Sequence, residues 1–473
     1  MTGLALVPSL LLWLAAAQAD GPAFDRTFTG LTLRVDYHHS GTAKEEHFSL
    51  DRARIEGPWP GSRTRLLDET NLGKYLVEVA DLQTHRTIYS RGFASIYGEW
   101  ETTGEARDGV WRTLQEAVRV PEPRRPVEVR IRKRQADQSF REIWSLVIDP
   151  SSRFVDRARV QERPVHEILV SGDPSVKLDL LVLGDGYTEG ELERFHADAE
   201  RLVAAMFATE PYASRRDQFN VRAVDSPAAE SGISRPRAGV FRDSPLGARY
   251  NTFDSERYVL SLEDRKWRDV AAAAPYDHVL ILVNERKYGG GGIFNLYSTA
   301  AASSAFADYL VIHEFAHHLG GLADEYFTSE VAYEDDAGEQ VEPWEVNVTA
   351  LSDPSTLKWG DLVTEGTPLP TPWDREGYEK RSRASQAERS KLREAGAKEE
   401  MLEDLFKREQ EEFTRMLSTQ DHAGKIGAFE GAMYQSRGLY RPATDCVMFT
   451  RDRVGFCAVC RRGLEQVIDL YTR

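Results

Sequence analysis

The sequence predicts an α+β protein in which an N-terminal β-sandwich domain precedes an α/β domain. Residues 24–163 alternate apolar and polar side chains in short runs bounded by Gly, Pro and Asp, a pattern typical of half-buried strands. From residue 176 onward, near-continuous apolar runs alternate with amphipathic segments, as in buried parallel strands and their helices. We therefore expect the first domain over 20–163 and the second over 164–473.

The composition is that of an ordinary globular protein. Of its 473 residues, 41% are hydrophobic and 29% are charged, which is enough to bury a sizeable core in two or three domains. The formal net charge of −16 argues against binding to nucleic acid or to an anionic membrane surface. After the N-terminus, no segment reaches the ~18 apolar residues of a membrane span. The oligomeric state is left open.

The N-terminus has the pattern of a secretory signal peptide. Residues 4–17 are apolar, and Ala-Gln-Ala at 17–19 is a small-x-small cleavage site. No Lys or Arg precedes the apolar run, which departs from the usual pattern. The sequence predicts a signal peptide over 1–19 and an exported mature protein.

The expected secondary structure follows from the same patterns. In the first domain, strands are predicted at 31–37, 75–79 and 127–132, and the second domain has predicted strands at 176–184, 219–225 and 278–284. Thr188 with Glu191 forms a capping-box signature, which predicts a helix from there to about residue 209. A last helix is predicted over 463–471. His38, His39 and His47 have no paired ligand spacing and are expected at the surface or in turns.

The stretch around His313-Glu-Phe-Ala-His317 predicts a zinc site. Residues four apart lie on one face of a helix, one turn apart, so His313 and His317 can reach the same Zn²⁺. Glu314 is rotated away from that line, where it can act as a general base toward a zinc-bound water without binding the metal. Gly320 and Gly321 predict the end of this helix.

Two carboxylates follow the predicted end of the helix. Asp324 or Glu325 can supply a third ligand from the turning chain. Before the helix, residues 289–292 are four glycines, which predict either a flexible loop or a close backbone approach. Residues 293–299 then alternate like an edge strand, which could pair with an extended peptide.

The segment 374–417 is intensely charged and has an apolar stripe. We interpret it as a helical insertion, either one long amphipathic helix or two helices broken near Gly396. It serves either as a solvated face or as a gate for substrate or a partner. Upstream, Asn347-Val-Thr349 is a glycosylation sequon.

The chain has three cysteines, Cys446, Cys457 and Cys460. Three are too few for a disulfide-stapled scaffold. A single C-x-x-C is a weak signal for a structural zinc site. In an exported protein, a disulfide between two of the three is the preferred expectation, with the pairing left open.

The motifs together resemble the bacterial IgA peptidase family of zinc metallopeptidases. The resemblance is carried by the H-E-x-x-H stretch with its Gly-Leu-Ala-Asp-Glu-Tyr extension to Tyr326, and it extends to several other segments, which are 178–187, 429–432, 439–442, 446–448 and 456–460. The β-rich N-terminal region is similar to the extra domain of such proteins.

The resemblance implies a metzincin-like α/β zinc-peptidase domain. It implies Met448 as the methionine of a turn beneath the metal, and Asp324 as the preferred third ligand with Glu325 as the alternative. A phenol could assist at the developing oxyanion, and the candidates by motif position are Tyr326, Tyr434 and Tyr440.

These expectations combine into a secreted, Zn²⁺-dependent endopeptidase that acts on a protein or peptide substrate. An alternative is a secreted binding or adhesion protein with a non-catalytic zinc site, against which the intact Glu314 argues. A third hypothesis is a zinc hydrolase of non-peptide amides or esters.

Overall fold

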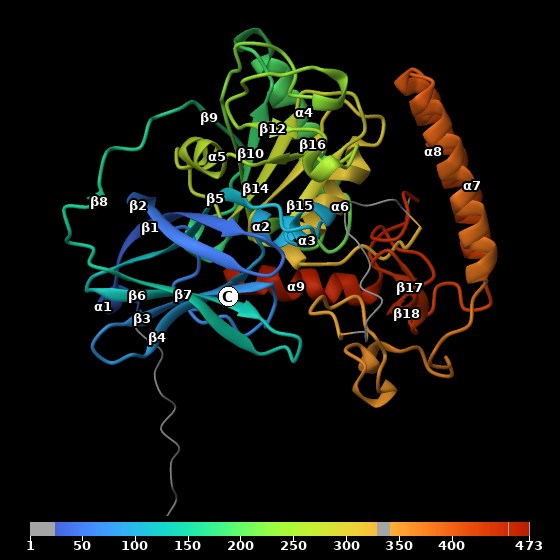
Figure 1. The fold of residues 1–473 in the computed structure, drawn as a ribbon, viewed down its shortest axis with the longest axis horizontal. Helices are drawn as coiled ribbons and strands as arrows, with labels where there is room; N and C mark the ends of the chain where they lie inside the picture. The colour runs from blue at the N-terminus through green and yellow to red at the C-terminus, as the bar shows by residue number, and fades with distance from the viewer. Residues whose placement is uncertain (1–23, 329–340, 453, 473) are drawn as a thin grey trace, which may run out of the picture.

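The computed structural model describes residues 24–328, 341–452 and 454–472. It has the mixed α+β architecture that the sequence predicts (Figure 1). The predicted signal peptide over 1–19 lies outside the described residues. In the part of the chain that is described, no helix has the length and apolar character that crossing a membrane requires.

Two four-stranded sheets form the first part of the chain, with strand orders β5-β1-β2-β8 and β4-β3-β6-β7. Apolar side chains from both sheets build one shared core, because each strand buries alternate residues, as Val77 and Val79 do in β3. The three predicted strands lie within β1, β3 and β6. The bounds are α1 (Phe24–Thr27), β1 (Phe28–Gly41), β2 (Glu46–Pro58), β3 (Tyr75–Asp81), β4 (Thr87–Phe93), α2 (Ile96–Trp100), α3 (Gly104–Arg107), β5 (Arg112–Pro123), β6 (Val127–Arg134), β7 (Phe140–Ile148) and β8 (Val155–Asp156).

One histidine of these sheets departs from the sequence expectation. His39 is 1% exposed, and its ring nitrogens lie 2.9 Å from Glu116 Oε2 and 3.0 Å from Glu46 Oε2. Burial by itself lowers the pKa of His39, but the two carboxylates outweigh it, so its pKa is raised above the ordinary value. The prediction of a surface or turn position is therefore wrong for His39, because carboxylates from other strands make a charged imidazole stable in the core.

We expect the free energy of unfolding to decrease as pH rises through the folded-state pKa of His39. A raised folded-state pKa stabilises the fold below the unfolded value of about 6.5, and this contribution is lost above the folded value. Urea unfolding at pH 5.5 and at pH 8.5 measures the contribution of His39 to the free energy of unfolding. In His39→Gln this part of the pH dependence disappears, whereas the exposed His47→Gln should keep it. An unchanged pH dependence in His39→Gln would contradict the assignment.

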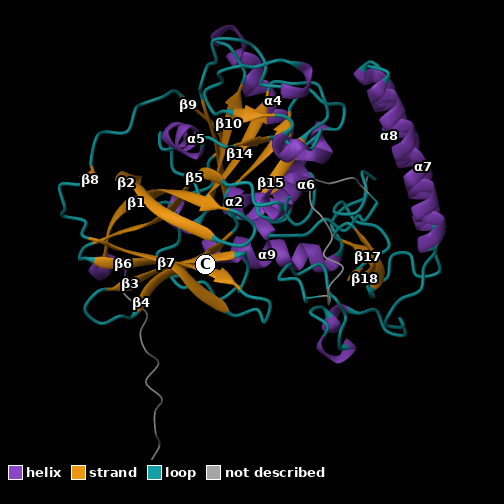
Figure 2. Cartoon of the chain, viewed as in Figure 1, coloured by secondary structure: helices purple, strands orange, loops and turns teal. Residues whose placement is uncertain are grey.

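A six-stranded sheet forms the centre of the second part (Figure 2). Its strand order is β15-β16-β14-β10-β11-β9. The four inner strands are parallel, and the edge strands β15 and β9 run antiparallel to their neighbours. Every residue of the inner strands is buried, in agreement with the apolar runs. The bounds are β9 (Val165–Leu169), β10 (Leu178–Asp185), β11 (Phe219–Val224), β14 (His278–Val283), β15 (Gly290–Ile293) and β16 (Tyr297–Ala301).

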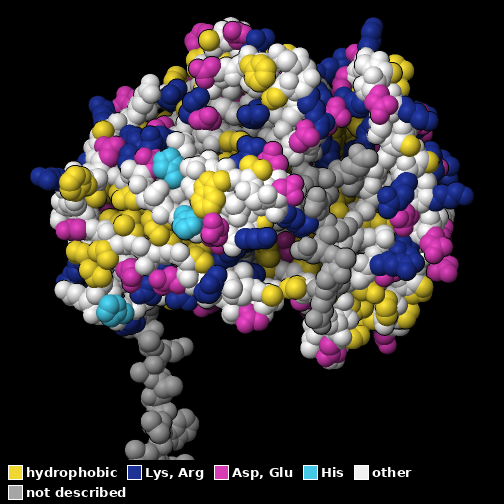
Figure 3. All heavy atoms as spheres, viewed as in Figure 1, with side chains coloured by type: hydrophobic (Ala, Val, Ile, Leu, Met, Phe, Trp, Pro, Cys, Tyr) yellow, Lys and Arg dark blue, Asp and Glu magenta, His cyan; other side chains and the backbone are white. Residues whose placement is uncertain are grey.

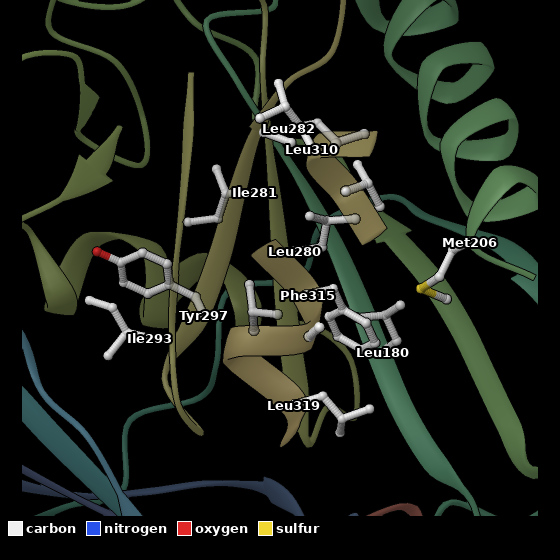
Figure 4. Close-up of a cluster of buried hydrophobic side chains, with 14 of the residues drawn as sticks. Leu180, Met206, Leu280, Ile281, Leu282, Ile293, Tyr297, Leu310, Phe315 and Leu319 are labelled. Atoms are coloured by element: carbon white, nitrogen blue, oxygen red, sulfur yellow. The ribbon is translucent and has the colours of Figure 1, made fainter. Parts of the chain in front are cut away.

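Helix α6 (Ala307–Gly320) lies on this sheet and carries the two motif histidines. Figure 4 shows Phe315 and Leu319 of α6 in one apolar cluster with Leu280 of β14 and Leu180 of β10. The predicted capping box is present, because Thr188 N donates to Glu191 at 2.9 Å, and α4 (Leu192–Met206) follows it. The other elements here are α5 (Asp264–Ala271), α9 (Ala458–Thr472), β12 (Ala248–Arg249) and β13 (Leu260–Ser261).

The charged insertion forms two helices, α7 (Arg375–Glu394) and α8 (Glu399–Ser418). They pack against each other, and Gly396 between them has a φ of +64°, so the prediction of two helices broken at this glycine is confirmed. Acidic and basic side chains are intermixed on the outward face of this pair (Figure 3). A short hairpin of β17 (Phe429–Ala432) and β18 (Gln435–Arg441) follows.

The first part of the chain packs directly on the second. Arg34 of β1 is completely buried and its Nη2 donates to Asp269 of α5 at 2.5 Å. Nearer the edge strand, Ala94 N donates to Phe294 O at 2.9 Å, and Asn295 Nδ2 donates to Gly92 O at 2.9 Å. The N-terminal sheets therefore support the turn between β15 and β16.

Candidate functional site

The two motif histidines meet at their ring nitrogens near the end of α6. His313 Nε2 and His317 Nε2 lie 3.1 Å apart, as the i,i+4 spacing predicts. Gly321 ends the helix with a φ of +57°, and its N–H donates to His317 O at 3.0 Å, which is a left-handed cap that favours glycine. The chain then turns back toward the histidines.

This return brings Asp324 to both histidines. Asp324 Oδ1 lies 3.0 Å from His313 Nε2 and 3.2 Å from His317 Nε2. Burial by itself raises the pKa of the Asp324 carboxyl, but the two imidazoles outweigh it and hold that pKa well below its usual range. Asp324 is therefore an anion, the form in which a carboxylate binds a metal cation.

The three donor atoms fit a zinc ion. Tetrahedral zinc with bonds of ~2.0–2.1 Å separates its nitrogen and oxygen ligands by about 3.3 Å, and the observed separations are 3.0, 3.1 and 3.2 Å. A carboxylate oxygen of Glu314 lies within 4.8 Å of the ligand nitrogens of His313 and His317. Two imidazoles and one carboxylate are a ligand set of catalytic zinc sites, which keep a fourth position open.

Burial also affects the carboxyl of Glu314. Its side chain is 6% exposed, and burial raises the pKa of its carboxyl, against the opposing effect of the two histidines. A raised carboxyl pKa suits a group that must accept a proton near neutral pH. Gly290 lies directly against this side chain, since a Cβ on Gly290 would lie 3.2 Å from Glu314 Oε1.

The glycine run is an edge strand and not a flexible loop. The strand predicted at 293–299 is misplaced, because β15 covers Gly290–Ile293 and the following β16 is an inner strand. A Cβ on Gly292 would lie 2.1 Å from Glu314 O and 2.8 Å from His317 Cβ. Glycine is required here because the strand passes directly against the helix that carries the site.

We expect Gly292→Ala to lower kcat/KM for peptide cleavage by about 10²-fold. The added methyl group displaces α6, and a displacement of about 1 Å at reacting groups has an effect of that size. The measurement is steady-state kinetics beside Gly57→Ala, where a Cβ meets nothing within 4 Å. Equal activity of both variants would contradict this packing role of Gly292.

Backbone carbonyls orient the two histidines through their Nδ1 atoms. His313 Nδ1 lies 3.0 Å from Val447 O, and His317 Nδ1 contacts Leu322 O. These contacts leave both Nε2 atoms free to bind a metal. Met448 is completely buried next to Val447, and its carbonyl accepts the N–H of Glu325 at 2.9 Å. The segment of the predicted methionine turn thus lies against both His313 and the Asp324–Glu325 pair.

Two of the three candidate tyrosines lie at the site. Tyr434 OH donates to Asp324 Oδ2, and the ring of Tyr326 stacks near His313 with centroids 6.2 Å apart. Tyr440 is instead paired with Thr349 through backbone hydrogen bonds. Met433 and Tyr434 form the two-residue turn between β17 and β18, and their φ values of +46° and +65° are those of a type I′ hairpin turn.

Sequence reasoning missed Arg257. It is half-buried, and its Nη2 donates to Tyr326 OH at 2.8 Å. Burial raises the pKa of Glu314, and the charge of Arg257 opposes a part of that rise. Arg257 lies in an irregular segment 57 positions before Glu314 and has no motif around it. The fold brings this segment to the site, because Val259 N donates to Gly290 O and Gly290 N donates to Arg257 O, each at 3.1 Å.

Glu325 faces away from the histidines. Its Oε1 accepts from Asn347 Nδ2 at 3.0 Å and lies 3.1 Å from Cys460 Sγ. The cysteines are free, so the expected disulfide is not formed. Asn347 is completely buried, and its amide fixes the turn after α6, which makes it a structural residue and not an accessible glycosylation acceptor.

A pocket opens beside His313, and the insertion forms one of its walls. Its lining includes Tyr326 next to the site, Tyr378 and Arg389 of α7, and Phe413 of α8. The rings of Tyr378 and Phe413 have centroids 5.0 Å apart. The insertion therefore has an inner face toward the site as well as a solvated outer face.

Two protein-family models match the chain. The model of IgA Peptidase M64 matches residues 166–468, which include most of β9, the motif helix α6 and most of α9. The model of the Peptidase M64 N-terminus matches residues 23–145, which include most of the two N-terminal sheets. No curated protein matches the chain. Because the first match alone covers more than half of the chain, this protein belongs to the IgA peptidase M64 family.

Proposed function

We propose that this peptidase is a zinc-dependent endopeptidase whose metal is held by His313, His317 and Asp324. The observation that carries the proposal is the convergence of these three donor atoms within 3.0–3.2 Å of one another, with the buried Glu314 beside them. Membership of a peptidase family supports hydrolysis of peptide bonds. The apolar run at 4–17 supports export of the mature protein.

In this mechanism, side chains of the protein position the substrate and transfer the proton of the attacking water. Zinc, when bound, acts as a Lewis acid toward the carbonyl and lowers the pKa of a bound water to about 7. Glu314 accepts the proton of the attacking water and then delivers it to the leaving amine. Tyr434 orients Asp324 through its hydroxyl. Tyr326, held by Arg257 at 2.8 Å, supplies a phenol near the scissile carbonyl.

The substrate is an extended peptide in this proposal. Gly292 is half-buried on the edge strand β15 and adjoins His317, so its backbone lies where an extended chain could pair with it. Gly290 is already paired with the segment around Tyr258. The available edge is thus the part of β15 closest to the histidines.

Purified mature protein with unfolded casein tests the function. We expect cleavage at internal peptide bonds, loss of cleavage in a chelator, and recovery on addition of Zn²⁺. Mass spectrometry of the fragments distinguishes endopeptidase cleavage from trimming of chain ends. Cleavage that is insensitive to the chelator would contradict metal dependence. Hydrolysis of esters or amides without cleavage of any peptide would favour a non-peptide hydrolase.

Because Arg389 lines the pocket beside His313, we expect the enzyme to prefer peptide substrates that place an acidic side chain in this pocket. The pKa of Arg389 is lowered to about 10 by burial and by the charges of Arg451 and Arg257. Among the described residues, no carboxylate forms a salt bridge with it. A charged hydrogen bond of ~1.5–3 kcal/mol corresponds to about a 10–100-fold change in rate. Arg389→Gln should therefore lower kcat/KM for acidic peptides by that factor and leave apolar peptides unaffected, and an equal loss for both would contradict it.

A further inference from the structure

The three cysteines of the chain meet Glu325 in the core, on the side of Asp324 away from the histidines. Cys446 Sγ lies 3.8 Å from Cys460 Sγ, and Cys460 Sγ lies 3.1 Å from Glu325 Oε1. With Cys457, the three sulfur atoms and a Glu325 oxygen all lie within 4.8 Å of one another. Cys446, Cys460 and Glu325 are completely buried.

We propose that this cluster binds a second, structural zinc ion through four protein ligands, Cys446, Cys457, Cys460 and Glu325. Tetrahedral zinc with bonds of ~2.3 Å separates two sulfur ligands by about 3.8 Å, which is the distance between Cys446 and Cys460. A disulfide requires about 2.05 Å. Four protein ligands close the coordination sphere, which distinguishes a structural site from a catalytic one.

The Glu325 carboxylate gives independent evidence for a cation. Its Oε1 accepts from Asn347, but its Oε2 is buried and has no hydrogen-bond partner among the described residues. A buried carboxylate oxygen beside sulfur atoms is unfavourable unless a cation or a donor compensates it. Arg441 is buried and interacts with Glu325 electrostatically, which offsets part of the negative charge of the ligand set.

Backbone N–H groups already point at two of the sulfurs. Cys457 N donates to Cys446 Sγ at 3.4 Å, and Cys460 N donates to Cys457 Sγ at 3.4 Å. Such outer contacts orient and stabilise thiolate ligands. On binding, Zn²⁺ displaces the three thiol protons to solvent, and no oxidation is involved.

The second zinc would hold together the segments that build the histidine site. Glu325 directly follows Asp324, and Cys446 precedes Val447, whose carbonyl contacts His313. Cys457 immediately precedes α9, and Cys460 lies in the first turn of that helix. Each ligand is thus adjacent to a group that positions the first metal or to a helix packed on α6. The proposal stands on this cluster alone and does not depend on peptidase activity.

Two measurements on the mature protein test the proposal, which are metal analysis and a count of reactive thiols. We expect two zinc ions per chain in the wild type, one in His317→Gln, which loses only the histidine site, and one in Cys446→Ser. Three thiols should react in denaturant with chelator and no reductant, and this count needs no variant. Because all cysteines belong to the cluster, a single reactive thiol would mean a disulfide and would overturn the proposal.

Cobalt substitution separates this site from the histidine site. His317→Gln loaded with Co²⁺ should show thiolate-to-cobalt charge-transfer absorption, and Cys446→Ser should lack it. In the His317→Gln background, a chelator should remove the remaining zinc and lower the melting temperature. A folded His317→Gln chain that has three free thiols but no metal would overturn the second site. If His317→Gln retains zinc but the wild type cleaves no peptide, only the proposed function is contradicted.

Discussion

Glu314→Gln should lower kcat for casein cleavage by about 10²–10⁴-fold, the range of general acid–base catalysis, while the zinc content stays unchanged. The amide has the shape of the carboxylate but cannot accept the proton of the attacking water. Glu314 is buried and contacts Gly290 closely, so the isosteric change preserves packing. The measurements are steady-state kinetics and metal analysis on the same preparations.

Two further variants make this result specific. Glu314→Asp keeps a carboxylate but withdraws it by one methylene, and we expect an intermediate loss. Asp308→Asn, on the exposed side of the same helix, should retain full activity. A Glu314→Gln enzyme with zinc and wild-type kcat would contradict the role of Glu314 as the base.

Asp324→Asn should remove the zinc of the histidine site and the activity with it. The change takes away the anionic oxygen that lies 3.0 and 3.2 Å from the two histidine nitrogens. We expect the zinc affinity of that site to fall by more than the ~10–100-fold typical of losing a second-shell partner. Competition with a chromophoric chelator measures this affinity.

The neighbouring carboxylate is the matched control. Glu325→Gln keeps the hydrogen bond from Asn347 at Oε1 but removes the charge near Cys460. It should weaken zinc at the cysteine cluster and leave zinc bound at the histidines. The opposite pattern, with histidine-bound zinc lost in Glu325→Gln and kept in Asp324→Asn, would make Glu325 the third ligand.

The elements with strong periodicity could be predicted from the sequence. The inner strands β10, β11 and β14 have continuous apolar runs because both faces are covered. The spacing of His313 and His317 is local, so the helix brings them together wherever it lies. The edge strand β15 was misplaced because glycines have no side chains and hence no periodicity. Their position follows instead from the approach of α6, which only the fold reveals.

The remaining features depend on contacts between distant segments. His39 is buried because Glu116, 77 positions away, meets its ring. Local spacing does not decide between Asp324 and Glu325, since the two side chains of adjacent residues point to opposite sides of one turn. Only the family resemblance favours Asp324. Cys460 meets Glu325 across 135 positions, so the short C-x-x-C spacing revealed only part of the cluster.

Anomalous scattering at the zinc absorption edge, from crystals of the wild-type protein, locates the metal and identifies its ligands. We predict a peak bonded to His313 Nε2, His317 Nε2 and a carboxylate oxygen of Asp324, with no fourth protein ligand and with Glu314 close by but not bound. No peak at these atoms would contradict the zinc enzyme. A peak at these atoms that is closed by a fourth protein ligand would indicate a structural metal in a binding protein.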